Sequence, residues 1–167
     1  IDLLDEERLQ YVGSMVLGLN DALVELTGTL AGLSFALQDN RLVALSGLIT
    51  GISATLSMAS SEYLSARSEG NTNALKSSLY TGIMYIFAVV LLVLPYLVLP
   101  SDQFVPALMI MLVIVVAIIF SFTYYISVAK DLPFKKRFLE MAVISLSVAA
   151  LSFGVGILVK QFLGIDV

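Results

Sequence analysis

The chain has 167 residues, of which 59% are hydrophobic and 13% are charged, with a formal net charge of −4 and a mean hydropathy of +0.97. A soluble domain of this size needs a larger charged fraction to cover its surface, and the lack of a basic stripe argues against a nucleic-acid partner. Without cysteine or histidine, the chain has no disulfide, zinc cluster or Ser-His-Asp triad, so we expect neither enzyme activity nor a permanently bound cofactor.

Residues 1–11 combine helical apolar spacing with a high charge, from Asp2 to Glu7, so they are not a signal peptide. This stretch has the character of the middle of a helix, and we expect a cytoplasmic acidic helix or the end of a linker. Because the chain begins without Met, we also expect that a preceding part was removed.

Residues 12–167 are predicted to form one transmembrane domain. A bilayer core of about 30 Å needs roughly 20 mostly apolar residues per helix. Five stretches meet that length, with charge, Pro, Gly or Asn between them: 12–37, 42–66, 78–100, 104–129 and 136–162. Their apolar runs are continuous and long, which excludes a barrel of alternating strands. The predicted fold is an all-α integral membrane protein of five transmembrane helices.

The basic residues predict the orientation of this bundle. Seven of the nine fall in segments that share a side with the N-terminus: Arg8, Arg67, Lys76, Lys130, Lys135, Lys136 and Arg137. Only Arg41 and Lys160 fall on the other side. Because basic loops stay in the cytoplasm, we expect a cytoplasmic N-terminus and an outer C-terminus.

The first helix carries two carboxylates, Asp21 and Glu25, well inside an apolar segment. Ionisable groups at that depth cost at least ~2.5–3.5 kcal/mol each, so they normally face a wet pathway or a partner. Their spacing of four puts both on one helix face, and small residues extend that face: Ser14, Gly18, Gly28 and Gly32. The stripe predicts a seam between helices that holds two negative charges.

The second helix repeats this pattern. Gly51, Thr55, Met58, Glu62, Ser65 and Glu69 follow one another at spacings of three and four, and Gly47-x-x-x-Gly51 offers a second close-packing site. A rise of about 1.5 Å per residue puts Met58 in the layer of Asp21, with Glu62 one turn nearer the cytoplasm and Glu25 one turn deeper. Two alternatives remain open: Met58 as a packing residue and Glu62 as an interfacial one.

The third and fourth helices show no ionisable group over Val89–Leu94 and Leu108–Phe120, so we interpret them as lipid-facing or packing helices. Five tyrosines near their ends are expected to form aromatic belts: Tyr80, Tyr85, Tyr96, Tyr124 and Tyr125.

Two motifs resemble a known family. Leu17-Gly-Leu-Asn-Asp-Ala-Leu-Val24 and Leu56-Ser-Met-Ala-Ser-Ser-Glu-Tyr-Leu-Ser65 resemble the signatures in the first and second helices of the vacuolar iron transporter family. The helix count and inside N-terminus agree with it. Two positions differ, since Ala22 and Ser61 stand where the family usually has Gly.

The resemblance implies a homodimer that exchanges Fe²⁺, and often Mn²⁺, for protons along the dimer interface. Asp21 would be the translocating Asp, and Met58 and Glu62 the ligands of the second helix. The acidic seam is where such a dimer would close. The cytoplasmic metal-binding domain that eukaryotic members carry between helices 2 and 3 is absent, since only about Arg67–Ser77 joins them. Some prokaryotic relatives have a ferritin-like domain ahead of the first helix, and the acidic start would suit its linker.

These features together predict a carboxylate-based antiporter in a prokaryotic plasma membrane. The metal sites are expected at Asp21, Glu25, Met58, Glu62 and Glu69, with the ion entering at Glu62 and Glu69 and then reaching Asp21 and Met58 of both protomers. Met sulfur would favour Fe²⁺ over Mg²⁺, and repelling carboxylates would bind protons or metal in competition. Two other functions stay open: a non-transporting anchor for a ferritin-like domain, and a passive divalent-cation channel.

Overall fold

A computed structural model describes residues 2–164, with side chains from residue 11 onward. Over these residues every regular element is a helix: α1 (Asp2–Leu37), α2 (Asn40–Ser68), α3 (Ala74–Val98), α4 (Phe104–Lys130) and α5 (Phe134–Leu163). All five are long and apolar enough to cross a membrane, which confirms the predicted fold class. The first span continues back to Asp2 without a break, while the acidic side chains of that start lie outside the described ones.

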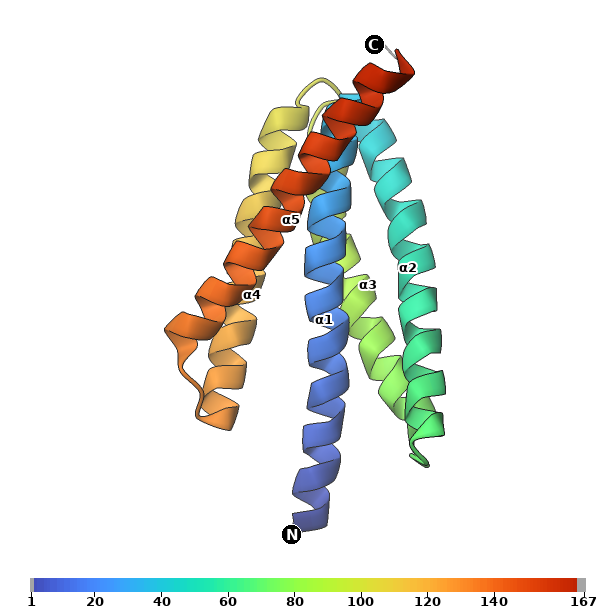
Figure 1. Ribbon diagram of the computed structural model, residues 1–167, viewed down its shortest axis with the longest axis vertical. Helices are drawn as coiled ribbons and strands as arrows, with labels where there is room; N and C mark the ends of the chain where they lie inside the picture. Colours follow the sequence, from blue (N-terminus) through green and yellow to red (C-terminus); the bar gives the residue numbers. More distant parts are fainter. Residues whose placement is uncertain (1, 165–167) are drawn as a thin grey trace.

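The helices alternate in direction and spread apart toward one end (Figure 1). The start of α1 and the α2–α3 and α4–α5 connections lie at that end, at the bottom of the view. We call it the basic end, because it carries Arg67, Lys76, Lys130, Lys135, Lys136 and Arg137.

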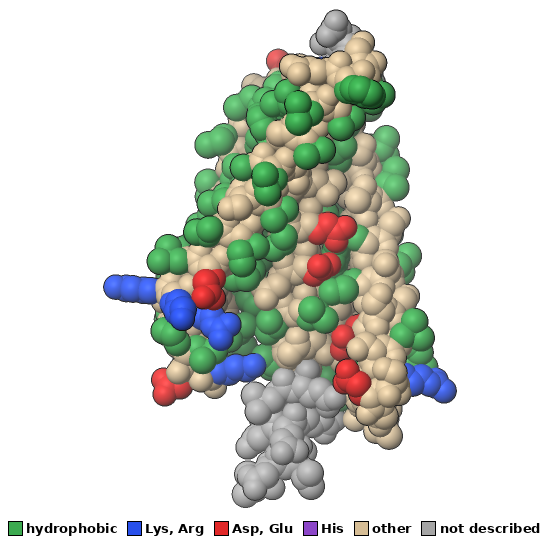
Figure 2. All heavy atoms as spheres, in the orientation of Figure 1, with side chains coloured by type: hydrophobic (Ala, Val, Ile, Leu, Met, Phe, Trp, Pro, Cys, Tyr) green, Lys and Arg blue, Asp and Glu red, His purple; other side chains and the backbone are tan. Residues whose placement is uncertain are grey.

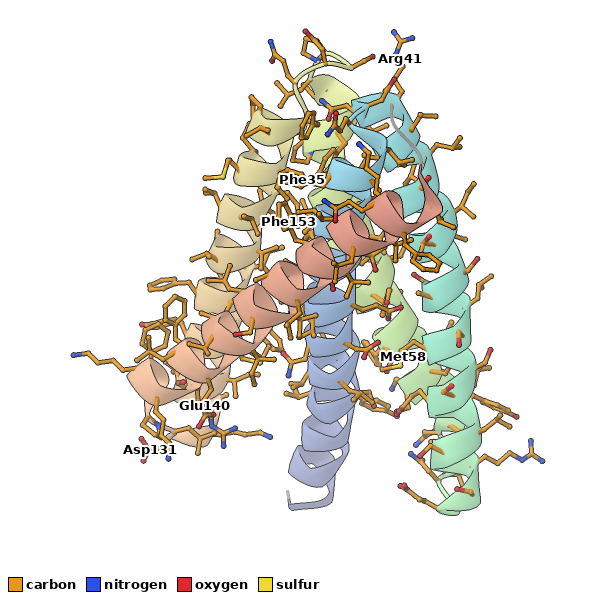
Figure 3. All side chains as sticks on the ribbon, turned by 45° about the horizontal axis from the view of Figure 1, so that its top comes forward. Phe35, Arg41, Met58, Asp131, Glu140 and Phe153 are labelled. Carbon is orange, nitrogen blue, oxygen red and sulfur yellow. The ribbon has the colours of Figure 1, made fainter. Side chains whose placement is uncertain are left out.

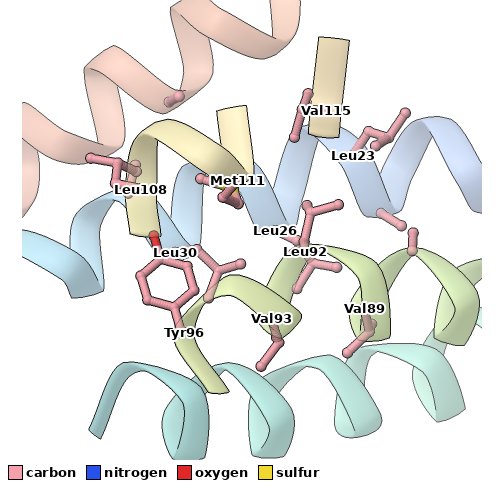
Figure 4. Close-up of a cluster of buried hydrophobic side chains, with 14 of the residues drawn as sticks. Leu23, Leu26, Leu30, Val89, Leu92, Val93, Tyr96, Leu108, Met111 and Val115 are labelled. Carbon is pink, nitrogen blue, oxygen red and sulfur yellow. The ribbon is translucent and has the colours of Figure 1, made fainter. Parts of the chain in front are cut away.

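The hydrophobic core lies where α1 packs against α3 and α4 (Figure 4). From α1 it takes Leu23, Leu26 and Leu30, which recur at spacings of three and four and are fully buried. From α3 and α4 it takes Val89, Leu92, Val93, Met111 and Val115, all fully buried as well. One face of α1 is therefore closed by protein rather than by lipid.

By contrast, α2 and α5 lie at the outside of the bundle. The buried residues of α5 are Ser145 and Ala149, although this helix is 30 residues long. Its upper half is held to α1 by the rings of Phe35 and Phe153, whose centroids are 3.8 Å apart in a T-shaped pair (Figure 3). Both outer helices thus leave wide apolar surfaces for the membrane or for another protein.

The small residues predicted to form a seam are used within the chain. A Cβ added at Gly18 would lie 2.6 Å from the carbonyl oxygen of Thr81 in α3, and one at Gly28 would lie 2.7 Å from Oγ of Ser152 in α5. Gly51 packs equally closely against Val89 of α3. These glycines therefore join helices within the chain, so the predicted seam between helices lies inside it, and the closing of a dimer there stays a prediction.

The end opposite the basic end is tied together by one side chain. Asn40 is fully buried, and its Nδ2 donates to the carbonyl oxygens of Pro100 at 2.7 Å and Gln103 at 3.0 Å. Its backbone N–H donates to the carbonyl of Ser101 at 2.9 Å. The α1–α2 and α3–α4 connections are thereby held as one unit.

Two of the five tyrosines do not lie in an aromatic belt. Tyr85 and Tyr96 of α3 are 0% and 1% exposed, and the hydroxyl of Tyr96 lies 2.7 Å from Oγ of Ser34 in a hydrogen bond. A buried tyrosine hydroxyl needs a hydrogen-bond partner, and α1 supplies that partner in both cases. The prediction for these two residues is wrong.

Candidate functional site

Four acidic residues lie on one side of the molecule, and we call this side the acidic face: Glu69, Glu62, Asp21 and Glu25. In Figure 2 acidic side chains form a row between α5 and α2. Asp21 and Glu25 are exposed on α1, one turn apart and deep within its membrane-spanning part. The structure therefore leaves the two deepest carboxylates open to whatever lies beside the protomer.

Glu25 is held by a tyrosine from the neighbouring helix. The buried hydroxyl of Tyr85 donates to Oε2 of Glu25 at 2.8 Å. This hydrogen bond satisfies the phenol and fixes the direction of the carboxylate.

Glu62 is held by two hydroxyls from different helices. Oγ of Ser14 in α1 and Oγ of Ser77 in α3 donate to the same oxygen, Oε1, at 2.9 and 2.7 Å. The backbone is fixed at the same place, because Thr81 donates through Oγ1 to the carbonyl of Ser14 at 3.0 Å. Glu62 therefore joins α1, α2 and α3 near the basic end.

Sequence reasoning missed the part that α3 plays here. Ser77, Thr81 and Tyr85 repeat at a spacing of four, so their hydroxyls form a row on one face of an otherwise apolar helix. This row meets Ser14, Glu62 and Glu25. The spacing was a usable signal, since three hydroxyls on one face of a membrane helix need polar partners.

A polar pocket of about 310 Å³ opens beside Glu62 at the basic end. Its polar lining comes from Ser14, Glu62, Ser65, Glu69, Asn71 and Ser77. Glu69 is exposed, so the pocket has one carboxylate at its rim and one held in its wall. An ion arriving at this end would meet these two groups first.

Met58 is partly buried and packs against the hydrophobic core (Figure 3). Its position supports the packing alternative and leaves its predicted part in metal binding untested. Glu62 lies at the level of Ser14, seven residues before Asp21, which is about 10 Å along α1. Counted from the basic end the order is Glu62, Asp21, Glu25, with a wider first gap than the single turn expected.

The acidic face of one protomer does not assemble a complete metal site. Among the described residues no three Asp or Glu side chains lie close enough together to hold an ion. A divalent cation needs six or more oxygen ligands, or four with softer atoms. The arrangement therefore supplies carboxylates in sequence along a path, and further ligands must come from water or from a second chain.

Comparison with known proteins agrees with the residues that build this face. The model of the VIT family matches residues 12–74, the stretch that holds α1 from its first apolar residues and all of α2. No curated protein matches the chain. The family is one of membrane proteins that transport divalent metal ions, rather than of enzymes. The similarity of this multi-pass membrane protein to the VIT family, the vacuolar iron transporters, thus lies in the two helices that carry its acidic face.

Proposed function

We propose that this protein moves Fe²⁺, and also Mn²⁺, out of the cytoplasm in exchange for protons, along the acidic face at the interface of a homodimer. The observation that carries the proposal is the exposure of Asp21 and Glu25 deep in a membrane span. Lipid tails offer these carboxylates no hydrogen bonds, so an uncovered acidic face would cost several kcal/mol. A second copy of the same face, or water held between two copies, removes that cost.

A two-fold arrangement also supplies the missing ligands. In a C2 dimer each residue at the axis appears twice. Asp21 and Glu25 of both protomers would therefore give four carboxylates within one helical turn of depth. That number suits a divalent ion, which one protomer alone does not accommodate. With the glycines already engaged inside each protomer, the acids remain free to face the partner.

The path would begin at the basic end, whose excess of Lys and Arg favours the cytoplasmic side of the membrane. Glu69 and Glu62 line the polar pocket there, and Asp21 and Glu25 follow deeper in α1. Carboxylates that lie in series can pass an ion on, because each binds it while none encloses it. The localisation we propose is the plasma membrane of a prokaryote.

Proton exchange follows from competition for the same oxygens. Clustered carboxylates repel one another, and either a metal ion or protons relieve the repulsion. Ion release toward the outside would thus be coupled to proton uptake at Asp21 and Glu25. Met58, placed beside the path by the proposal, would favour Fe²⁺ over Mg²⁺ through its softer sulfur.

Proteoliposomes with an internal pH-sensitive dye test this proposal. We expect Fe²⁺ flux with opposite proton flux, and Asp21→Ala should abolish both. Asp102→Ala, in the α3–α4 connection, is the matched control and should transport normally. Met58→Leu should keep the fold and lose the preference for Fe²⁺.

The outcomes separate the three functions. Metal flux without proton flux would indicate a passive channel, and no flux in well-folded protein would indicate a membrane anchor. Transport that survives Asp21→Ala would refute the pathway. Cross-linking of single cysteines introduced on the acidic face would test the dimer independently of transport.

A further inference from the structure

A second polar region lies on another face of α1, away from the acidic face. It is a cavity of about 220 Å³ between α1, α4 and α5, reached by Val16 and Asn20 from α1. At about 100° per residue, these two positions lie roughly 140° around α1 from Asp21 and Glu25. The cavity is therefore separate from the proposed metal path.

This cavity opens at the basic end, where the α4–α5 connection lies. Lys130, Arg137 and Glu140 line it there, and Figure 3 labels Glu140 at this end of α5. Deeper in, its lining changes to Thr123, Ile126, Met141 and Ile144. It thus runs from a charged mouth into the membrane-spanning part of the bundle.

One buried polar atom that lines the cavity has no protein partner in the described part of the chain. Oδ1 of Asn20 accepts no hydrogen bond there. Oγ of Ser127 and Oγ of Ser145 are without a partner as well, but neither residue lines the cavity, so they do not enter the argument.

Several polar side chains of the bundle find a partner within the protein, as Thr27 does at the carbonyl of Leu23 and Thr55 at that of Gly51. Oδ1 of Asn20 does not. A buried polar atom without a partner, beside a cavity large enough for several water molecules, is the usual setting of buried water.

We propose that the cavity between α1, α4 and α5 is a water-filled crevice, open at the basic end, in which water donates to Oδ1 of Asn20. The crevice also gives protons a route into the bundle that does not coincide with the metal path. This proton route rests on the proposed function. The two basic residues at the mouth, Lys130 and Arg137, outnumber the acidic Glu140, so a divalent cation is repelled there while water in the crevice can still carry protons.

The absence of cysteine from the sequence allows a direct test of the water. Thr123→Cys places a thiol in the crevice, and Ser121→Cys places one two residues away, on an exposed position that lines an apolar groove. Only a thiol in contact with water ionises and reacts with a charged methanethiosulfonate. We expect the variant at 123 to react at least about tenfold faster than the variant at 121, with the anionic sulfonatoethyl reagent faster than the cationic one.

Equal or slower reaction at 123 would overturn the water-filled crevice. Ile126→Cys, which also lines the cavity, provides the same test if the variant at 123 does not fold. Adding Asn20→Leu to the variant at 123 should lower its reaction rate several-fold, since the carboxamide that binds water is gone. An unchanged rate would contradict the assignment to Asn20.

The proton route is tested by filling the crevice. After modification at 123, Fe²⁺-driven proton flux should fall at least about tenfold, while Fe²⁺ binding in detergent stays within about twofold of the unmodified variant. Modification at 121 should leave both unchanged. Normal proton flux with a filled crevice would refute the route, whereas absence of flux before modification would refute the proposed function instead.

Discussion

Glu25 and Leu26 are neighbours in α1, yet their surroundings have little in common. Leu26 is fully buried in the core shared with α3 and α4, while Glu25 is exposed on the acidic face and bonded by Tyr85. A turn of about 100° separates a closed apolar interior from a surface that needs a polar cover. The comparison shows that α1 separates the closed hydrophobic core of the bundle from its exposed acidic face, the side that we propose for ions.

Placing an acidic side chain in the core, or an apolar one on the acidic face, should have the largest effect on folding and on transport respectively. Leu26→Glu places a carboxylate among apolar side chains without a partner, which costs more than the ~2.5–3.5 kcal/mol of a charge at mid-membrane. We expect no monodisperse protein in detergent by size-exclusion chromatography. Glu25→Leu, by contrast, should yield normal amounts of folded protein with strongly reduced metal flux. If both variants fold equally well, the two sides of α1 do not differ as described.

Overfilling the close contacts between helices should have the next largest effect. A Cβ at Gly51 would lie 2.5 Å from Cγ1 of Val89, so Gly51→Leu must push α2 away from α3. Overpacking of this kind costs about 1–3 kcal/mol, and we expect a lower Tm and less protein. Gly154→Leu is the control, because nothing lies within 4 Å of that position. A similar Tm for both variants would contradict the close packing of α2 on α3.

Removal of the tyrosine hydroxyl should affect the acidic face alone. Tyr85→Phe keeps the buried ring and deletes the hydrogen bond to Glu25, whose strength is about 1.5–3 kcal/mol for a charged acceptor. We expect the KM for Fe²⁺ or the maximal flux to change by about tenfold, with a fall in Tm that reflects the lost hydrogen bond but leaves the protein folded. The same substitution at Tyr96, which bonds Ser34 away from the acids, should leave transport unchanged. Equal transport defects in both would mean that the hydroxyl of Tyr85 acts only on the fold.

The smallest effect is expected at the two serines of α3. Ser77→Ala removes one of the two hydroxyls on Glu62, while Ser78→Ala removes a hydroxyl that donates to the carbonyl of Ala59. Since Ser14 still donates to Glu62, we expect only a two- to five-fold rise in the KM for Fe²⁺ in the first variant, consistent with about 1 kcal/mol. The second variant should keep its KM. A larger change at Ser78 than at Ser77 would contradict the role of Glu62 at the polar pocket.

The five spans could be predicted from the sequence because a bilayer demands about 20 apolar residues per helix and charge or proline marks the breaks. It was harder to predict which face of each helix packs against protein and which faces lipid. In a soluble protein polar residues mark the outside, but here Leu45 of α2 and Leu26 of α1 are equally apolar, and one is 56% exposed while the other is buried. Hydropathy does not distinguish lipid from a protein core, so the partners of Gly18 and Gly51 stayed open.

The candidate site, too, could be predicted only in part. Carboxylates deep in a span are visible in any sequence because they are costly, and Asp21 and Glu25 were found in this way. The groups that orient the acidic side chains, Ser77 for Glu62 and Tyr85 for Glu25, were missed because single hydroxyls cost little in a membrane helix. Only their shared spacing of four, together with the hydroxyl of Thr81 between them, distinguishes them from surface residues.

The buried side chain of Asn40 has a consequence for motion. Its hydrogen bonds to Pro100 and Gln103 connect two helix hairpins at the end away from the basic residues, where the helices lie closest together (Figure 1). A hinge at such a joint converts a small rotation into a displacement that grows with distance along the helices. Over α2, which at about 1.5 Å per residue is about 43 Å long, a tilt of a few degrees would move Glu62 and Glu69 by ångströms while the α1–α2 and α3–α4 connections stay fixed.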